Sequence, residues 1–217
     1  MALRDNIYKK MSFAVLIKGS FTHDILKPSW LQEKGFISES DISNNIIVTN
    51  QSTTFKTTYF TLNCTREQFY IETTNIDFKE ILVETVKGIF TILSEHPISE
   101  LELRSDVHFN LESAEQRNHI FRQLSNYNSL NGLFQNPNTT FISIFDTISQ
   151  HEVRRVQASV CSSNPNHIQL FSINEYNMKT LFHKNIRSEQ IPIFLELEKV
   201  ENNINFSLSA FENIIKQ

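Results

Sequence analysis

Residues 76–110 constrain the fold more than any other part of the sequence, because they join an amphipathic helix directly to a long alternating strand. Asp77 and Glu80 have the spacing of a capping box, which places a helix start at this point. Pro97 disfavours helical geometry in the residue before it and therefore ends the helix. The pattern predicts a helix over residues 78–95.

The apolar residues of the predicted helix recur at helical spacing and share one face. Glu84 and Lys87 lie on the other face as an i,i+3 ion pair. Gly88 lies at the edge of the apolar stripe, where the missing side chain permits close approach of a neighbour. We therefore expect a core helix packed across a sheet through Phe78, Ile81, Leu82, Val86, Ile89, Ile92 and Leu93.

The strand predicted over residues 100–110 carries four ionisable side chains in one row, namely Glu102, Arg104, Asp106 and His108. We call these four residues the charged row. A histidine beside a carboxylate is favoured in its charged form, so the row is the candidate functional site. The alternative is a solvated sheet face whose charges pair with the neighbouring strands. The opposite side of this strand is expected in the core and consists of Leu101, Leu103, Ser105, Val107 and Phe109.

The composition excludes several classes of function. The 217 residues suit one large domain or two small lobes, and 40% of them are hydrophobic. With only 4 glycines, the chain has neither a Walker loop nor a G-x-G-x-x-G motif, which argues against nucleotide chemistry. The net charge of −4 gives no attraction to nucleic acid or to an anionic membrane.

The sequence also favours a cytoplasmic protein. No apolar run approaches the roughly 18 residues of a membrane span, and the run after the N-terminus is too short for a signal peptide. Cys64 and Cys161 match neither a metal motif nor a disulfide framework, so we expect free thiols in a reducing compartment.

The first half of the chain reads as an α+β lobe, residues 1–125. A helix over residues 113–125 begins at a capping box formed by Ser113 and Gln116. An Asn-rich loop over residues 126–138 is the candidate boundary between two lobes. A short helix is expected at residues 28–35, and further strands at residues 12–18, 46–50, 53–64 and 69–74.

The second half, residues 139–217, reads as a β-rich lobe with a C-terminal helix at residues 207–216. Its order of strands and then a helix echoes the first half. The whole chain is therefore predicted to be α+β, with mostly antiparallel sheet and two similar lobes. Strands are expected at residues 139–149, 152–162, 167–174 and 191–198.

No pair or cluster of residues matches an established catalytic motif. Asp106 with His108 could contribute to a metal site, but the spacing is not that of a zinc motif. Cys161 would need His151 or His167 beside it to act as a nucleophile. We therefore expect no cofactor and no metal.

Residues 77–109 resemble a unit found in uncharacterised bacterial α+β proteins. The resemblance covers about a seventh of the chain and includes no catalytic motif. It implies an α+β fold and a bacterial or phage setting, without an activity.

These observations favour a non-catalytic interaction or assembly protein that associates with itself or with a protein partner through sheet edges and polar sheet faces. The alternative is a metal-assisted hydrolase or nuclease that uses the polar face of residues 100–110. The two hypotheses differ in what the charged row does: it contacts a partner in the first and performs chemistry in the second.

Overall fold

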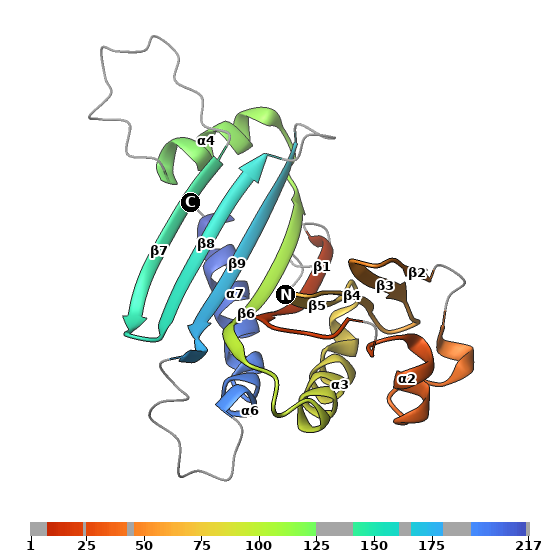
Figure 1. Cartoon of the computed structure of the whole chain (residues 1–217). Coiled ribbons are helices and arrows are strands. Elements are labelled where there is room, and N and C mark those ends of the chain that lie inside the picture. The colour runs from red at the N-terminus through yellow and green to blue at the C-terminus, as the bar shows by residue number, and fades with distance from the viewer. Residues whose placement is uncertain are drawn as a thin grey trace.

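The computed structural model describes residues 8–23, 25–42, 46–124, 141–160, 166–179 and 192–215. Nine strands form one antiparallel sheet in the order β2-β3-β4-β5-β1-β6-β9-β8-β7, so the fold is α+β as predicted (Figure 1). The strands are β1 (Tyr8–Gly19), β2 (Ile47–Val48), β3 (Ser52–Lys56), β4 (Thr61–Thr65), β5 (Gln68–Thr73), β6 (Ile98–Asn110), β7 (Phe141–Ser149), β8 (Glu152–Val160) and β9 (His167–Asn177). The α-helices are α2 (Pro28–Glu33), α3 (Lys79–Ile92), α4 (Ala114–Leu124), α6 (Pro192–Leu197) and α7 (Val200–Ile215).

Helices α3, α4 and α7 pack on the same face of the sheet, which we call the helix face; the other is the open face. Leu101 and Leu103 of β6 join residues of α3 and α7 in the main core cluster. Val107 and Phe109, further along the same side of β6, join α4 in a second cluster. The side of β6 that was predicted to be apolar is therefore the buried one, because α3, α4 and α7 cover it.

Near the centre of the sheet, β1 and β6 pair antiparallel with Val15 opposite Leu103, and the first half of the chain meets the second where β6 pairs with β9. Outward from this pair, β5, β4 and β3 follow β1 on one side, and β9, β8 and β7 follow β6 on the other. The sheet is thus continuous from one half to the other. The loop predicted at residues 126–138 lies outside the described residues.

The prediction of one strand over residues 53–64 is wrong, because β3 and β4 form an antiparallel hairpin there. The hydroxyl of Thr57 accepts backbone hydrogen bonds from Tyr59 and Phe60 and donates to the Phe60 carbonyl. This local side-chain turn competes with extended backbone and reverses the chain. A second hairpin, between β4 and β5, turns at residues 65–68.

The strand predicted at residues 191–198 is also wrong, because α6 occupies Pro192–Leu197. Proline suits the first turn of a helix, where its missing N–H costs nothing. The apolar residues that alternate in this segment belong to a short helix and the turn after it, and not to a strand. After that turn α7 begins at Val200, seven residues before the predicted start.

The predicted start and face of α3 need correction as well. The N-cap residue of α3 is Phe78, which makes no side-chain cap hydrogen bond. The Asn75 side chain, and not Asp77, caps the 3₁₀ turn Ile76–Phe78 that precedes α3, by accepting from the Asp77 N–H. The buried face is rotated, so that Ile81 and Ile92 are exposed. The residues buried in their place include Val83 and Phe90.

Gly88 permits the close approach that the sequence indicated. A Cβ atom at this position would lie 2.2 Å from Cε1 of Phe36, so the phenyl ring occupies the space of a side chain. The predicted ion pair on the outer face of α3 is also present, with 3.1 Å between Lys87 Nζ and Glu84 Oε1.

Candidate functional site: the open face of the sheet

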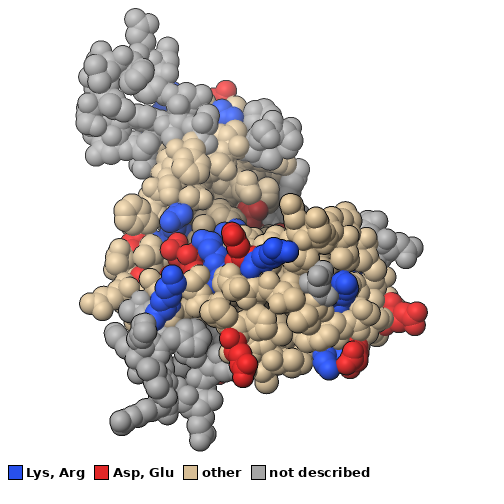
Figure 2. All heavy atoms as spheres, in the orientation of Figure 1, with Lys and Arg blue, Asp and Glu red and all other residues tan. Residues whose placement is uncertain are grey.

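The charged row lies on the open face, near the centre of the sheet, because β6 pairs with β1 on one side and β9 on the other. Acidic and basic side chains lie next to each other near the middle of this face (Figure 2). The row is therefore surrounded by neighbouring strands and is not at an edge. Glu102 is 5% exposed, and the other three residues are half-buried.

Glu102 is held by two cations. Its carboxylate accepts a hydrogen bond of 2.7 Å from Arg104 Nε, and Lys18 Nζ of β1 lies 3.3 Å from its other oxygen. The Arg104 guanidinium also stacks over the ring of Phe171 from β9, 5.8 Å from its centroid. A buried carboxylate with two cationic partners satisfies the requirement that buried charge be paired.

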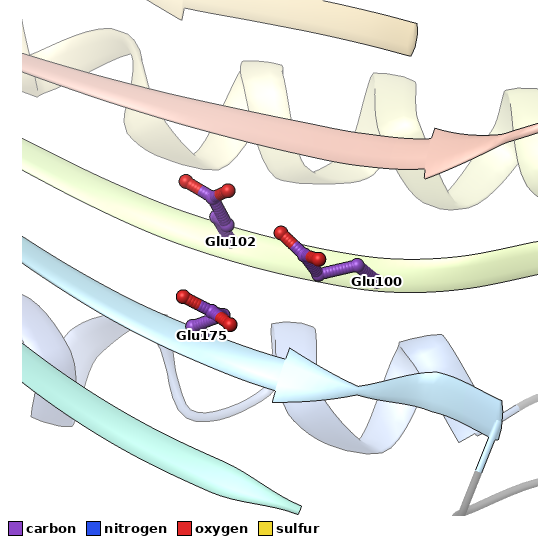
Figure 3. Close-up of side chains that lie close together, drawn as sticks. All are labelled: Glu100, Glu102 and Glu175. Atoms are coloured by element: carbon purple, nitrogen blue, oxygen red, sulfur yellow. The ribbon is translucent and has the colours of Figure 1, made fainter. Parts of the chain in front are cut away.

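Two further carboxylates meet Glu102, one from the same strand and one from β9. Candidate ligand oxygens of Glu100, Glu102 and Glu175 all lie within 4.8 Å of one another (Figure 3). Antiparallel pairing causes this, since Glu102 stands directly opposite Glu175. Oxygen ligands of this kind bind hard divalent cations such as Mg²⁺ and Ca²⁺.

Three cations accompany these three carboxylates. Lys18 donates a hydrogen bond to Glu100, Arg104 donates one to Glu102, and Arg155 Nη2 of β8 lies 3.7 Å from a Glu175 oxygen. The cluster is thus electrically balanced by the protein itself.

This environment shifts the pKa values of the two β6 carboxyls in opposite directions. Burial raises the pKa of Glu100 above its usual range, and its hydrogen bond to Glu102 raises it further, against the effect of Lys18. Burial alone would also raise the pKa of Glu102, but the hydrogen bond from Glu100 and the Arg104 charge lower it below the usual range. When the pair carries a single proton, that proton is favoured on Glu100, which donates it to Glu102.

The far end of the charged row forms a separate group. Asp106 Oδ2 accepts a hydrogen bond of 2.8 Å from Gln169 Nε2, and His108 Nε2 lies 3.4 Å from the same oxygen. Among the described residues, the other carboxylate oxygen of Asp106 is buried without a hydrogen-bond partner. The structure thus divides the row, because Glu102 and Arg104 belong to one group and Asp106 and His108 to another.

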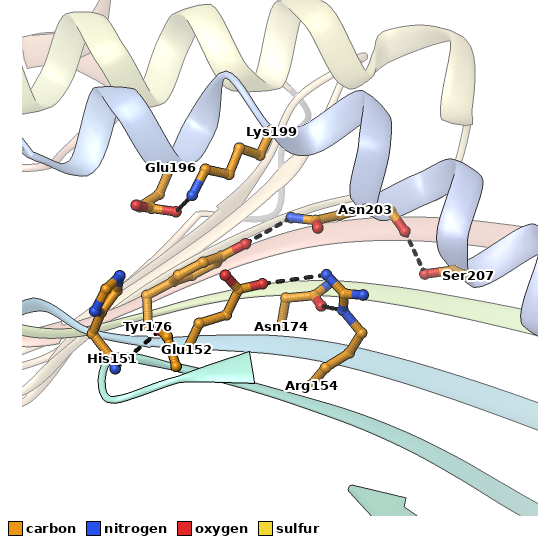
Figure 4. Close-up of polar contacts among 10 residues, drawn as sticks. His151, Glu152, Arg154, Asn174, Tyr176, Glu196, Lys199, Asn203 and Ser207 are labelled. Carbon is orange, nitrogen blue, oxygen red and sulfur yellow. Dashed lines mark hydrogen bonds and ion pairs between the residues drawn. The ribbon is translucent and has the colours of Figure 1, made fainter. Parts of the chain in front are cut away.

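A second polar network, which the sequence did not reveal, lies on the helix face beneath α6 and α7 (Figure 4). Arg154 of β8 donates to Asn174 Oδ1 at 2.8 Å and approaches Glu152 at 3.3 Å. Its guanidinium lies 4.3 Å from the centroid of the Phe206 ring on α7. The hydroxyl of Tyr176 accepts a hydrogen bond of 3.1 Å from Asn203 Nδ2.

This network attaches α7 to the sheet through polar contacts. Tyr176 is fully buried, and burial raises its pKa to about 12, so its hydroxyl stays neutral. Arg154 and Arg155 point to opposite faces, because adjacent residues of a strand alternate between its two sides.

The two histidines that could activate a cysteine nucleophile lie at different places in the sheet. His151 precedes β8 at the end where Glu152 pairs with Tyr176, whereas His167 opens β9 at the other end of the same ladder. The two histidines therefore cannot both flank one nucleophile. Cys161 itself lies outside the described residues.

Exposed hydrophobic side chains gather on the first strand of the second half, at one edge of the sheet. Phe145 of β7 is 69% exposed, and Phe141, Ile144 and Ile148 are 55%, 54% and 45% exposed. The opposite edge, β2, exposes Ile47 and Val48 but is only two residues long.

The chain matches no protein-family profile and no curated protein sequence. None of the helices in the described ranges is long and apolar enough to cross a membrane.

Proposed function

We propose that this chain is a non-catalytic assembly protein that binds a protein partner along the β7 edge of its sheet. A single observation carries the proposal: β7 is a nine-residue edge strand whose side chains are almost all exposed and largely apolar. Within the described part of the chain, β7 pairs with β8 alone. Its outer N–H and C=O groups are therefore available to another strand.

The sequence of β7 lacks the devices that normally keep an edge strand unpaired. Edge strands are commonly protected by lysine, by proline or by being short. The segment FISIFDTIS contains neither lysine nor proline, and Asp146 is its one charged residue. The other edge is protected by length, because β2 consists only of Ile47 and Val48. This contrast supports β7 as the binding edge.

The charges of the open face also favour binding over catalysis. Glu102 is nearly buried and paired with Arg104 and Lys18, so its carboxylate is committed to protein cations. Balanced ion pairs of this kind orient a partner and exclude wrong ones, and contribute less to affinity. We propose that this face is a polar rim beside the apolar edge.

A lysine placed on β7 tests the proposal. Phe145→Lys adds a charge of the type that protects natural edges, at a side chain that supports no core packing. We expect unchanged thermal stability and loss of association, measured by sedimentation velocity and by capture of partners from the native host. Ile47→Lys is the matched control, because it makes the same change at a 59% exposed residue of the other edge. The proposal fails if wild type and both variants have the 25.3 kDa monomer mass and capture the same proteins.

A second candidate function is metal-assisted hydrolysis, and the three-carboxylate cluster is the observation that favours it. Glu100, Glu102 and Glu175 would hold a divalent cation, with Asp106 and His108 on the same face for proton transfer. Titration with Mn²⁺ followed by calorimetry tests it, with Glu175→Gln expected to abolish binding. Stability and activity of Arg104→Ala and His108→Ala would show whether the charged row does more than face solvent. Absence of Mn²⁺ binding by the wild-type protein would rule this candidate out.

We further propose that the protein works in a reducing compartment such as the cytoplasm, and that its halves are two similar lobes. Cys64 is a buried free thiol, which supports the first point. The order of strands supports the second, because β5, β4 and β3 lie outward from β1, and β9, β8 and β7 lie outward from β6. The boundary between the lobes would then precede β6. In this proposal α3 and α7 are the equivalent helices that each lobe packs across its half of the sheet.

A further inference from the structure

Resting on the proposed function, we infer that the partner of β7 is the β7 strand of a second copy, paired antiparallel about a twofold axis that passes beside Ser143. A homotypic partner follows from the two edges being unequal. Pairing β7 with β2 of another copy would match nine residues with two. Pairing β7 with β7 matches five β7 residues of each copy in the register derived below, and the contact closes after two copies.

The side chains of β7 select the register. An axis beside Ser143 places Phe145 opposite Phe141 and Ile144 opposite Ile142, twice each by symmetry. Aromatic pairs and aliphatic pairs of this kind stabilise antiparallel strands when they stand directly opposite. Every such pair also keeps each residue on its own face, because an axis perpendicular to the sheet does not exchange the faces.

The one charge in β7 supports the same register. With the axis beside Ser143, the two Asp146 residues are six positions apart along the strands, about 20 Å at about 3.4 Å per residue. An axis beside Phe145 would bring them within two positions, about 7 Å. Like charges close together on paired strands are unfavourable. The Ser143 register thus removes the repulsion and keeps the apolar pairs.

The backbone of β7 is regular where this pairing requires it. The ladder with β8 runs without interruption from Phe141 to Thr147, and the register shift occurs only between Thr147 and Ser149. A bulge disrupts and twists a strand locally, which discourages further pairing. The paired segment, residues 141–145, lies wholly in the regular part.

Single cysteines test the pairing. In antiparallel strands, facing residues have Cα atoms about 4.5–5.5 Å apart, within the range of a disulfide. Ser143→Cys should therefore cross-link two copies when oxidised with diamide. The background carries Cys161→Ser and retains Cys64, which is buried with a pKa raised to about 12 and so resists oxidation.

Thr147→Cys is the matched control, because Thr147 is equally a small exposed residue of β7. In the proposed register its two copies are eight positions apart, about 27 Å, and cannot be bridged. We expect at least tenfold more covalent dimer from Ser143→Cys than from Thr147→Cys, on non-reducing gels of the full chain. Equal yields, no dimer from Ser143→Cys, or the highest yield from Ile144→Cys or Phe145→Cys would overturn the inference.

The outcome separates this inference from the proposed function. If Ser143→Cys gives no dimer while Phe145→Lys still abolishes capture of a different protein, the edge binds a partner other than a second copy. If Phe145→Lys changes neither mass nor capture, the β7 edge is not a binding surface at all.

Discussion

Neutralising Glu102 and neutralising Glu100 should have different consequences for stability, although the two residues are neighbours on one strand face. Glu102 is 5% exposed and accepts from Arg104 Nε at 2.7 Å, with Lys18 at 3.3 Å. Glu102→Gln leaves the half-buried Arg104 guanidinium without its charged partner. Hydrogen bonds to charged groups contribute about 1.5–3 kcal/mol, so we expect a loss of about 2 kcal/mol at pH 7.

Glu100→Gln should change stability by less than about 0.5 kcal/mol. Burial raises the pKa of Glu100, so its ionised form is less favourable in the folded state than in the unfolded state, and a glutamine amide can still donate to Glu102. The ion pair with Lys18 that is lost is partly exposed, with side-chain exposures of 24% and 45%, and such pairs contribute little.

The pH dependence has a defined sign for each group. Because the pKa of Glu102 is lowered in the folded state, its contribution is present above the ordinary value of 4.5 and is lost as the pH falls through the folded value. The pKa of Glu100 is raised in the folded state, so its contribution to stability is present below the ordinary value and is lost as the pH rises through the folded value. Urea unfolding from pH 7 downwards checks this: the cost of Glu102→Gln should shrink with falling pH. Equal costs for the two variants at pH 7 would refute the reasoning.

Three further predictions concern packing. Ile89→Asp places an unpaired charge in a fully buried position and should unfold the protein. Burying such a charge costs several kcal/mol, a large share of a typical unfolding free energy of about 5–15 kcal/mol. A melt followed by circular dichroism checks this. Gly88→Ala should cost about 1 kcal/mol, because overpacking against Phe36 outweighs the better helix propensity, whereas in a Phe36→Ala background it should stabilise by about 1 kcal/mol. Asn203→Leu should cost about 1–3 kcal/mol in urea unfolding because it removes the partner of the buried Tyr176 hydroxyl, and adding Tyr176→Phe should recover most of the loss.

Local periodicity was sufficient to predict β6 and its two faces. The alternation of β6 assigned Leu103 and Val107 to the core and Glu102 to the other face, and both assignments match the structure, although Glu102 is buried by its neighbours. Periodicity failed where a single side chain overrode it. Thr57 reverses the chain inside an apparently continuous strand, and Pro192 opens a helix within an alternating segment.

The composition of the site depends on pairing between distant strands, which one sequence does not encode locally. Lys18 and Glu175 join Glu102 only because β1 and β9 flank β6. Which strand lies at the edge of the sheet also depends on pairing between distant strands. β7, β8 and β9 all read as strands, and only the order of the sheet leaves Phe141 and Phe145 exposed at its border.

Hydrogen–deuterium exchange of the β7 amides tests the central claim most directly. The outward-facing N–H groups of an unpaired edge strand exchange rapidly, and those of one that pairs with a second copy are protected in proportion to the dimer present. The account predicts that protection of residues 141–145 increases with protein concentration, while protection of β2, at the opposite edge, does not change. Rapid exchange of residues 141–145 at every concentration, with or without host extract, would contradict it.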